Sequence, residues 1–178
     1  EFAKVTYTKV PAEREMTVYD LLRHTAGLAY GEITANAPVK EAYTKAALFN
    51  PGALEFDSRD MTPAEQVERL ASAPLAHQPG IVWEYSLASD VLGRVVEAAS
   101  GKRMGDFLSE RLFGPLKMAD TGFWLAPEKL KRLAQPLPVD PVSGVANNLV
   151  DVSAQPKNDS GGAGAVGPAS DYLRFGQM

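Results

Sequence analysis

The segment from Ser86 to Ala99 has the strongest helical pattern in the chain. Apolar side chains recur along it at intervals of three or four residues, and Gly101 follows where a helix commonly ends. The apolar positions are Leu87, Ala88, Val91, Leu92, Val95, Val96 and Ala99. A helix with one apolar face must bury that face against other elements. The rest of the chain therefore has to supply packing partners for it.

Shorter patterns of the same kind predict further helices on both sides. Thr62, Pro63 and Glu65 combine a capping hydroxyl, a proline at the first helical position and a reciprocal carboxylate. Thr17 and Asp20 have the spacing of a second capping pair. The expected helices span 17–26, 38–49, 62–72, 86–99, 104–113 and 127–134, with one more from Pro168 toward the end. The sequence predicts a mainly α chain.

Few segments have the character of strands. Residues 3–8 alternate between apolar and polar side chains, and residues 122–125 form a short apolar run. Residues 135–168 are rich in Gly and Pro and show no periodicity, so they are expected to form one long irregular connection. We therefore expect a few short strands beside the helices.

Composition excludes several classes of function. The chain has 178 residues, close to the size of one domain, and a formal net charge of −4, which does not suit a nucleic-acid binder. No apolar stretch approaches the roughly 20 residues of a membrane-spanning helix. Cysteine is absent and His24 and His77 are far apart in sequence, so we expect no metal site and no cofactor. The compartment is not assigned by these features.

Short catalytic motifs are missing from the chain. It contains no Gly-x-Ser-x-Gly, no Ser-x-x-Lys and no Lys-Thr-Gly. His24 is interpreted as a residue in the last turn of its helix, where an imidazole can bond free carbonyl groups, and His77 as a loop residue. The run Gly161-Gly162-Ala163-Gly164 lacks the lysine of a phosphate loop and is interpreted as a turn before the last helix.

Tyr85 is the residue that fits a simple structural role least well. With Ser86 as the expected N-cap, Tyr85 occupies the position just before the cap. An apolar residue there normally packs on the fourth helical residue, which here is Asp90. That account fails, because Asp90 offers no apolar partner. Two interpretations stay open: core packing with a bonded hydroxyl, or a tyrosine used for chemistry.

Several segments together resemble one enzyme superfamily. Residues 22–28 read Leu-Arg-His-Thr-Ala-Gly-Leu, Tyr85-Ser86 precedes the long helix, residues 112–118 read Leu-Phe-Gly-Pro-Leu-Lys-Met, and residues 160–164 read Ser-Gly-Gly-Ala-Gly. This order resembles the serine β-lactamase-related superfamily, which holds class C β-lactamases, DD-peptidases and family VIII carboxylesterases. The resemblance implies the β-lactamase/transpeptidase-like α+β fold. It also implies that residues 1–178 are one piece, the helical middle portion of a larger domain, without the Ser-x-x-Lys and Lys-Thr-Gly regions.

The resemblance also suggests the site residues. Tyr85 matches the tyrosine of the family's Tyr-x-Asn motif, which moves a proton between the catalytic serine and the leaving group. Leu87 stands where that motif has asparagine, so it would offer substrate only apolar contact. Gly162 and Ala163 match a turn that borders the acyl pocket. The expected site is therefore Tyr85 as catalytic residue, with Leu87, Gly162 and Ala163 as substrate-binding residues.

The expected function follows from this match. Leucine in place of asparagine favours a serine hydrolase that cleaves carboxylic esters through an acyl-enzyme, and the chain by itself is expected to be inactive for lack of a nucleophile. The alternatives are a class C β-lactamase or DD-peptidase acting on β-lactams or peptidoglycan peptides, and a non-catalytic binding member of the fold. The expected partners are a small-molecule ester or β-lactam and, through unpaired sheet edges, a second copy of the chain.

Overall fold

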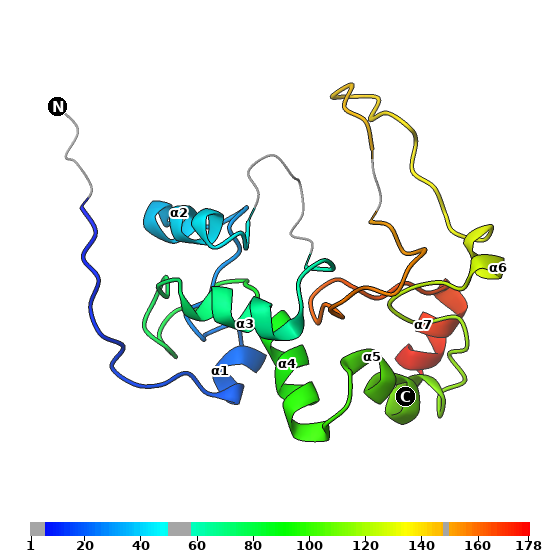
Figure 1. Cartoon of the computed structure of the whole chain (residues 1–178), viewed down its shortest axis with the longest axis horizontal. Helices are drawn as coiled ribbons and strands as arrows, with labels where there is room; N and C mark the ends of the chain where they lie inside the picture. The colour runs from blue at the N-terminus through cyan, green and yellow to red at the C-terminus, as the bar shows by residue number, and fades with distance from the viewer. Residues whose placement is uncertain (1–5, 50–57, 148–149) are drawn as a thin grey trace.

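The computed structural model describes residues 6–49, 58–147 and 150–178, and it is mainly helical, as predicted (Figure 1). One half of the molecule contains α1 to α4, and the other contains α5, α6 and α7. A long connection between α6 and α7 projects away from the helices. The helices are α1 (Val18–Leu22), α2 (Ala37–Lys45), α3 (Pro63–Ala71), α4 (Ala88–Ser100), α5 (Met104–Leu108), the π-helix η1 (Ser109–Phe113), α6 (Pro127–Leu130) and α7 (Ala169–Gly176).

Two helix starts are set by local hydrogen bonds that the sequence predicts. Thr17 caps α1 in a reciprocal box with Asp20, and Thr62 caps α3 in the same way with Glu65. Each box satisfies two backbone N–H groups that a helix end otherwise leaves without partners. Both predicted starts are confirmed.

Two helix ends in the first half of the chain, those of α1 and α2, fall earlier than predicted. α1 stops at Leu22 rather than near Ala26, because His24 adopts a left-handed conformation with φ of 54°. α2 stops at Lys45, and Ala47 has φ of 52°. A non-glycine residue in this region interrupts a right-handed helix. The chain turns at both places, and Leu48 then enters the core.

α4 and the helix after it follow the predicted pattern with two differences. Gly101 ends α4 with φ of 68°, as expected of a C-terminal glycine. α4 begins at Ala88, one residue later than an N-cap at Ser86 predicts. The predicted helix 104–113 is present, but its second half is the π-helix η1, in which the N–H of Gly114 donates to the carbonyl of Ser109 at 2.9 Å. α6 is shorter than the predicted 127–134.

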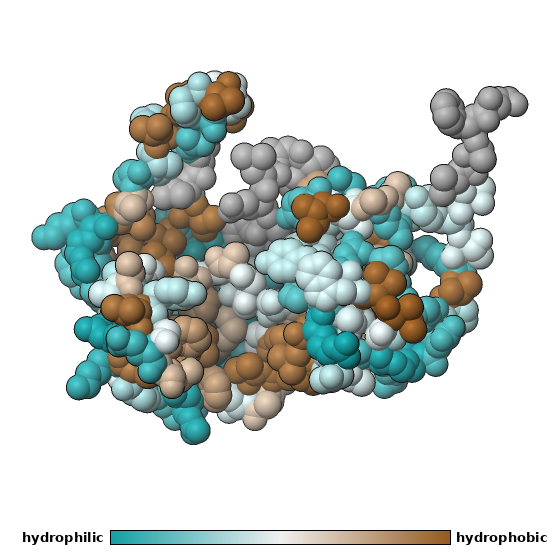
Figure 2. All heavy atoms as spheres, turned by 180° about the vertical axis from the view of Figure 1, so that it is seen from behind, coloured by the Kyte–Doolittle hydropathy of each residue, from teal (hydrophilic) through white to brown (hydrophobic). Residues whose placement is uncertain are grey.

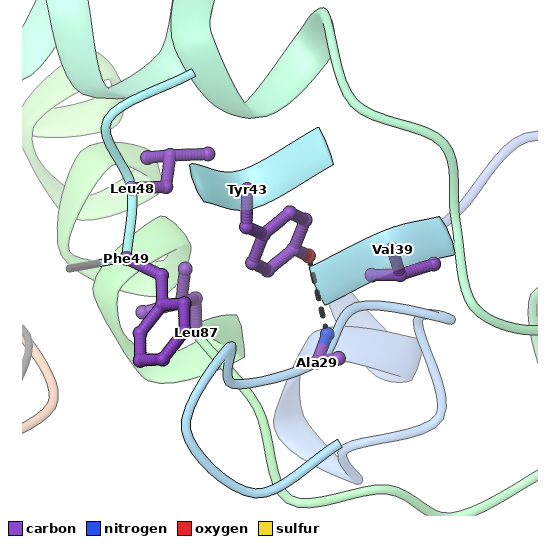
Figure 3. Close-up of a cluster of buried hydrophobic side chains, with 6 residues drawn as sticks. All are labelled: Ala29, Val39, Tyr43, Leu48, Phe49 and Leu87. Atoms are coloured by element: carbon purple, nitrogen blue, oxygen red, sulfur yellow. Dashed lines mark hydrogen bonds between the residues drawn. The ribbon is translucent and has the colours of Figure 1, made fainter. Parts of the chain in front are cut away.

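The core consists of two clusters that share the start of α4. Figure 3 shows the first, where Leu48 and Phe49 approach Leu87, and the Tyr43 hydroxyl points from α2 toward the backbone of Ala29. The bond itself runs from the N–H of Ala29 to the Tyr43 hydroxyl oxygen at 3.3 Å. The second cluster joins α1 to α4 and consists of Leu21, Ala26, Leu28 and Ala88. The segment between α1 and α2 is thereby fixed against α4.

The predicted strands are largely replaced by single bridges. Residues 6–8 are not in a strand, and residues 3–5 lie outside the described part of the chain. Gly122 forms an isolated antiparallel bridge with Val166, and Val139 forms another with Ala146. Across the described residues no regular strand is present, so the sheet edges expected to support self-association are not formed there. Self-association stays a prediction.

The irregular connection 135–168 is confirmed for the residues that the structure describes, which form turns and bridges without a helix. The surface seen from behind mixes polar and apolar side chains, and apolar groups gather over the middle of this face (Figure 2). Over the ranges described, no helix has the length and apolar character needed to cross a membrane.

Candidate active site

Tyr85 lies in an extended segment that leads into α4. The N–H of Glu84 donates to the carbonyl of His24 at 2.9 Å, and the N–H of Leu87 donates to that of Ala29 at 3.4 Å. These two bonds join the segment to the chain that follows α1. Tyr85 is held between them, and its side chain is 48% exposed.

The start of α4 places Tyr85 differently from the sequence prediction. Leu87, not Ser86, occupies the N-cap position, and it makes no side-chain capping bond. Ser86 is buried, with its Oγ 3.3 Å from Nδ1 of His24. Tyr85 therefore precedes the first helical residue, Ala88, by three positions rather than two.

Two aromatic rings contact that of Tyr85. The ring centroid of His24 lies 5.0 Å from that of Tyr85. The ring centroid of Tyr30 lies 5.1 Å from that of Tyr85. Trp83 approaches His24 edge-on at 6.3 Å and is 65% exposed. Such tilted contacts fix ring orientation and leave the edge of Tyr85 accessible. Tyr85 is thus an ordered, half-exposed phenol.

His24 does not have the role that the sequence suggested. His24 lies beyond the end of α1, and its backbone N–H donates to the carbonyl of Leu21 at 3.2 Å. Its ring turns toward Ser86 and Tyr85 instead of toward the carbonyls of α1. The left-handed backbone at His24 produces this direction. His24 is a neighbour of the candidate site.

The turn at Gly162 and Ala163 is organised by one hydroxyl group. Ser160 Oγ accepts hydrogen bonds from the N–H groups of Gly162 and Ala163, each at 3.2 Å. The same Oγ donates to Oδ1 of Asp90 at 2.6 Å. Asp90 belongs to the first turn of α4 and is 3% exposed. The turn is thereby attached to the helix that follows Tyr85.

Close backbone packing brings the turn next to the aromatic rings. A Cβ atom added at Gly162 would lie 2.7 Å from Oδ2 of Asp90 and 3.1 Å from the hydroxyl of Tyr30. A Cβ added at Gly161 would lie 2.2 Å from the carbonyl oxygen of Ser89. Only glycine fits at these positions without displacing a neighbour. The hydroxyl of Tyr30 thus lies at Gly162 while its ring contacts Tyr85.

Burial controls the charge of the groups between the turn and Tyr85. Desolvation raises the pKa of Tyr30 above its ordinary value, and the carboxylate of Asp90 and the adjacent Tyr85 raise it further. Desolvation also raises the pKa of Asp90, opposed by the hydrogen bonds from Ser160 and Gly162. Tyr30 is consequently a neutral phenol at physiological pH. It can donate a proton in a hydrogen bond, but it is unsuited to act as a base.

Leu87 lies in the core rather than at the site surface. It is 1% exposed and packs in the cluster with Ala29, Val39 and Phe49 (Figure 3). The backbone bond from Leu87 to Ala29 and the start of α4 turn this side chain inward. The structure brings Tyr85, Gly162 and Ala163 into one neighbourhood but does not place the Leu87 side chain where a substrate could touch it.

Sequence reasoning missed three residues of this neighbourhood, namely Tyr30, Asp90 and Ser160. Asp90 carried a usable signal, because a carboxylate in the first turn of a helix with a wide apolar face is buried only where it is hydrogen-bonded. Tyr30 and Ser160 had no comparable local signal. They reach the site only through contacts between residues 55 and 70 positions apart along the chain.

His77 lies in a loop, as the sequence indicated, and its Nε2 is 2.7 Å from Oε2 of Glu84. Within the described ranges, no three His, Asp or Glu side chains are grouped so that they could hold a metal ion.

Comparison with known proteins finds a family model and several relatives that match this chain. A family model described as beta-lactamase matches residues 4–178. Protein Rv1367c from Mycobacterium tuberculosis (strain ATCC 25618 / H37Rv) is 34% identical over 170 residues, covering 94% of this chain and 39% of that protein. Esterase EstB from Burkholderia gladioli is 35% identical over 182 residues, covering 92% of this chain and 44% of EstB.

A solved structure agrees with the sequence matches. EstCE1, described as a hydrolase with promiscuous acyltransferase activity, superposes with a TM-score of 0.65 at 29% identity, covering 90% of this chain and 44% of EstCE1. The chain therefore spans less than half the length of these relatives. Because the family model matches nearly the whole chain and its relatives share the fold, the chain belongs to the beta-lactamase family and has the β-lactamase/transpeptidase-like fold.

Proposed function

We propose that this chain forms part of the active site of a serine hydrolase that cleaves carboxylic esters through an acyl-enzyme. The observation that carries the proposal is Tyr85, an ordered and half-exposed phenol beside the Gly162 turn. The similarity to esterase EstB supports ester substrates. We use the name parent enzyme for a protein that contains this chain together with a Ser-x-x-Lys segment.

Tyr85 would act in proton transfer. As the serine oxygen forms its bond to the ester carbonyl carbon, the serine proton passes to the Tyr85 oxygen. The hydroxyl proton of Tyr85 passes at the same time to the lysine of the Ser-x-x-Lys segment, which enters the step as a neutral amine and returns the proton to Tyr85 in the next step. As the bond to the leaving alkoxide breaks, the same oxygen returns a proton to the alcohol that departs. Water then attacks the acyl-enzyme in the reverse sense and releases the acid. A positioned acid–base group of this kind contributes about 10²- to 10⁴-fold to the rate.

The turn at Gly162 and Ala163 would shape the acyl pocket rather than stabilise charge. Both of its N–H groups already donate to Ser160 Oγ, so they are not directed at a substrate oxygen. Its exposed backbone would meet the acyl group by contact. Selectivity would then depend on where the turn lies.

Leu87 enters the proposal in a different way from the sequence prediction. A buried leucine at this position leaves no side-chain amide to bind the amide of a β-lactam or a peptidoglycan peptide. A site without that polar contact loses discrimination in favour of such substrates. Esters are therefore the favoured class, and β-lactams are the substrates against which to test them.

The decisive experiment is Tyr85→Phe in the parent enzyme, with p-nitrophenyl acetate as substrate. The substitution keeps the ring contacts to His24 and Tyr30 and removes only the hydroxyl. We expect kcat to fall by about 10²- to 10⁴-fold with little change in Tm. Tyr172→Phe, on an exposed ring in α7, is the matched control and should retain normal kcat.

Near-normal kcat in a folded Tyr85→Phe enzyme would contradict the proposed catalytic role. A parent enzyme that binds esters without turning them over would instead identify a non-catalytic member of the fold. Hydrolysis of nitrocefin in preference to esters would support the β-lactamase alternative. The 178-residue chain by itself should hydrolyse neither p-nitrophenyl esters nor nitrocefin, because it contains no Ser-x-x-Lys nucleophile.

A further inference from the structure

We propose that Asp159 is a positioning residue for the acyl pocket, because its ion pair with Arg103 fixes the Gly162–Ala163 turn beside Tyr30. The inference rests on the proposed function, in which that turn borders the acyl group. It assigns the selectivity of the site to an ion pair that is not itself part of the turn.

The side chain of Asp159 is fully occupied by donors from the start of α5. Its Oδ2 accepts from Nε of Arg103 at 2.7 Å and from the N–H of Gly105 at 2.9 Å. Its Oδ1 accepts from Nη2 of Arg103 at 2.5 Å. The carboxylate is 2% exposed, so water does not compete for these bonds. A two-pronged pair of this kind fixes direction as well as distance.

The backbone around Asp159 is bound to two helices at once. The carbonyl of Asp159 accepts from Nη2 of Arg94 in α4 at 2.6 Å. The carbonyl of Pro156 accepts from Nη2 of Arg103 at 2.5 Å. Arg94 is itself 8% exposed, and its Nη1 lies 2.9 Å from Oε2 of Glu97. Two arginines therefore hold residues 156–159 against α4 and the start of α5.

The fixed position extends directly to the turn. Ser160 follows Asp159 and donates to Asp90, and Gly161 packs against the carbonyl of Ser89. Consecutive Cα atoms are about 3.8 Å apart, so a shift at Asp159 cannot be absorbed before Gly162 without breaking one of these contacts. The hydroxyl of Tyr30 lies against Gly162, so a shift of the turn would change this contact.

The Asp159 carboxylate is buried, whereas the Arg103 side chain is 27% exposed. Such an ion pair adds little net stability, and in this proposal its role is to specify one geometry. In this molecule the specified geometry is that of the Gly162–Ala163 backbone, three and four residues further along the chain. A change at Asp159 should consequently alter which acyl groups fit, and not only how stable the fold is.

The test uses the parent enzyme and p-nitrophenyl esters from acetate to octanoate. We expect Asp159→Asn to change the ratio of kcat/KM between octanoate and acetate by about tenfold, mainly through KM. Arg103→Lys keeps the charge but loses the two-pronged geometry, and it should move the ratio in the same direction by less. Arg103→Lys also provides the test if the Asp159→Asn enzyme does not fold. The control Glu110→Gln removes the carboxylate of an exposed ion pair with Lys102 and should leave the ratio unchanged.

A second readout does not depend on activity. The amide ¹⁵N–¹H resonances of Gly162 and Ala163 should shift in Asp159→Asn and Arg103→Lys and stay in place in Glu110→Gln. Equal loss of kcat/KM for all esters, or resonances that do not move, would overturn the positioning role. If the unmodified parent enzyme hydrolyses no ester while these resonances shift as expected, the proposed ester hydrolysis fails and the anchoring of the turn stands.

Discussion

Replacing Leu87 by alanine tests whether this residue supports the core or contacts substrate. The structure buries Leu87 to 1% exposure among Ala29, Val39, Tyr43 and neighbouring apolar side chains. The substitution removes three carbon atoms from this cluster. At about 0.8 kcal/mol for each, the lost transfer free energy is roughly 2.4 kcal/mol. A cavity that does not collapse adds to this, so we expect the free energy of unfolding to fall by about 2–5 kcal/mol.

The measurement is urea unfolding followed by circular dichroism and, separately, by tryptophan fluorescence. Leu173→Ala is the matched control, because Leu173 also belongs to a helix, α7, but is 61% exposed. It should change the free energy of unfolding by no more than about 0.5 kcal/mol. An equally small effect of Leu87→Ala would refute the core assignment. A changed ester selectivity at unchanged stability would restore Leu87 as a substrate contact.

Two further predictions concern stability. Tyr43→Phe removes the hydroxyl that accepts a hydrogen bond from the buried N–H of Ala29 at 3.3 Å. The free energy of unfolding, measured by urea unfolding, should therefore fall by about 1–3 kcal/mol. An unchanged free energy of unfolding would show that this bond contributes nothing to stability. Hydrogen bonds from Arg14 and Thr17 hold the pKa of Asp20 well below its ordinary value, so its stabilising contribution is present above about pH 4 and is lost as the pH falls further. Arg14→Gln should flatten the fall of Tm on acidification, and an unchanged slope would contradict this.

The sequence was sufficient where the determining interactions are local. The capping boxes at Thr17 and Thr62 join residues three positions apart, and Gly101 ends α4 by its own backbone freedom. The apolar repeat of α4 likewise depends only on helix geometry. The mainly α character and the family followed from such patterns, and so did the choice of Tyr85 as the candidate catalytic residue. Its catalytic role stays a prediction.

Tertiary contacts decided the rest. The backbone at His24 and Ala47 turns left-handed so that Leu28 and Leu48 can reach the core, and this shortens both preceding helices. Leu87 satisfies the apolar repeat equally well at a surface or in a core, and only its packing against Ala29 and Phe49 distinguishes the two.

The candidate site shows the same division. Tyr85 was visible in the sequence as a tyrosine before a helix, whereas Tyr30 and Ser160 acquire their positions from Tyr85 and Asp90, 55 and 70 residues away along the chain. The Asp159–Arg103 pair likewise joins segments 56 residues apart. Hydrogen bonds and ring contacts over such separations form only when the chain has closed on itself. Local periodicity therefore determined the helices of this protein, and the closed chain determined which side chains meet between them.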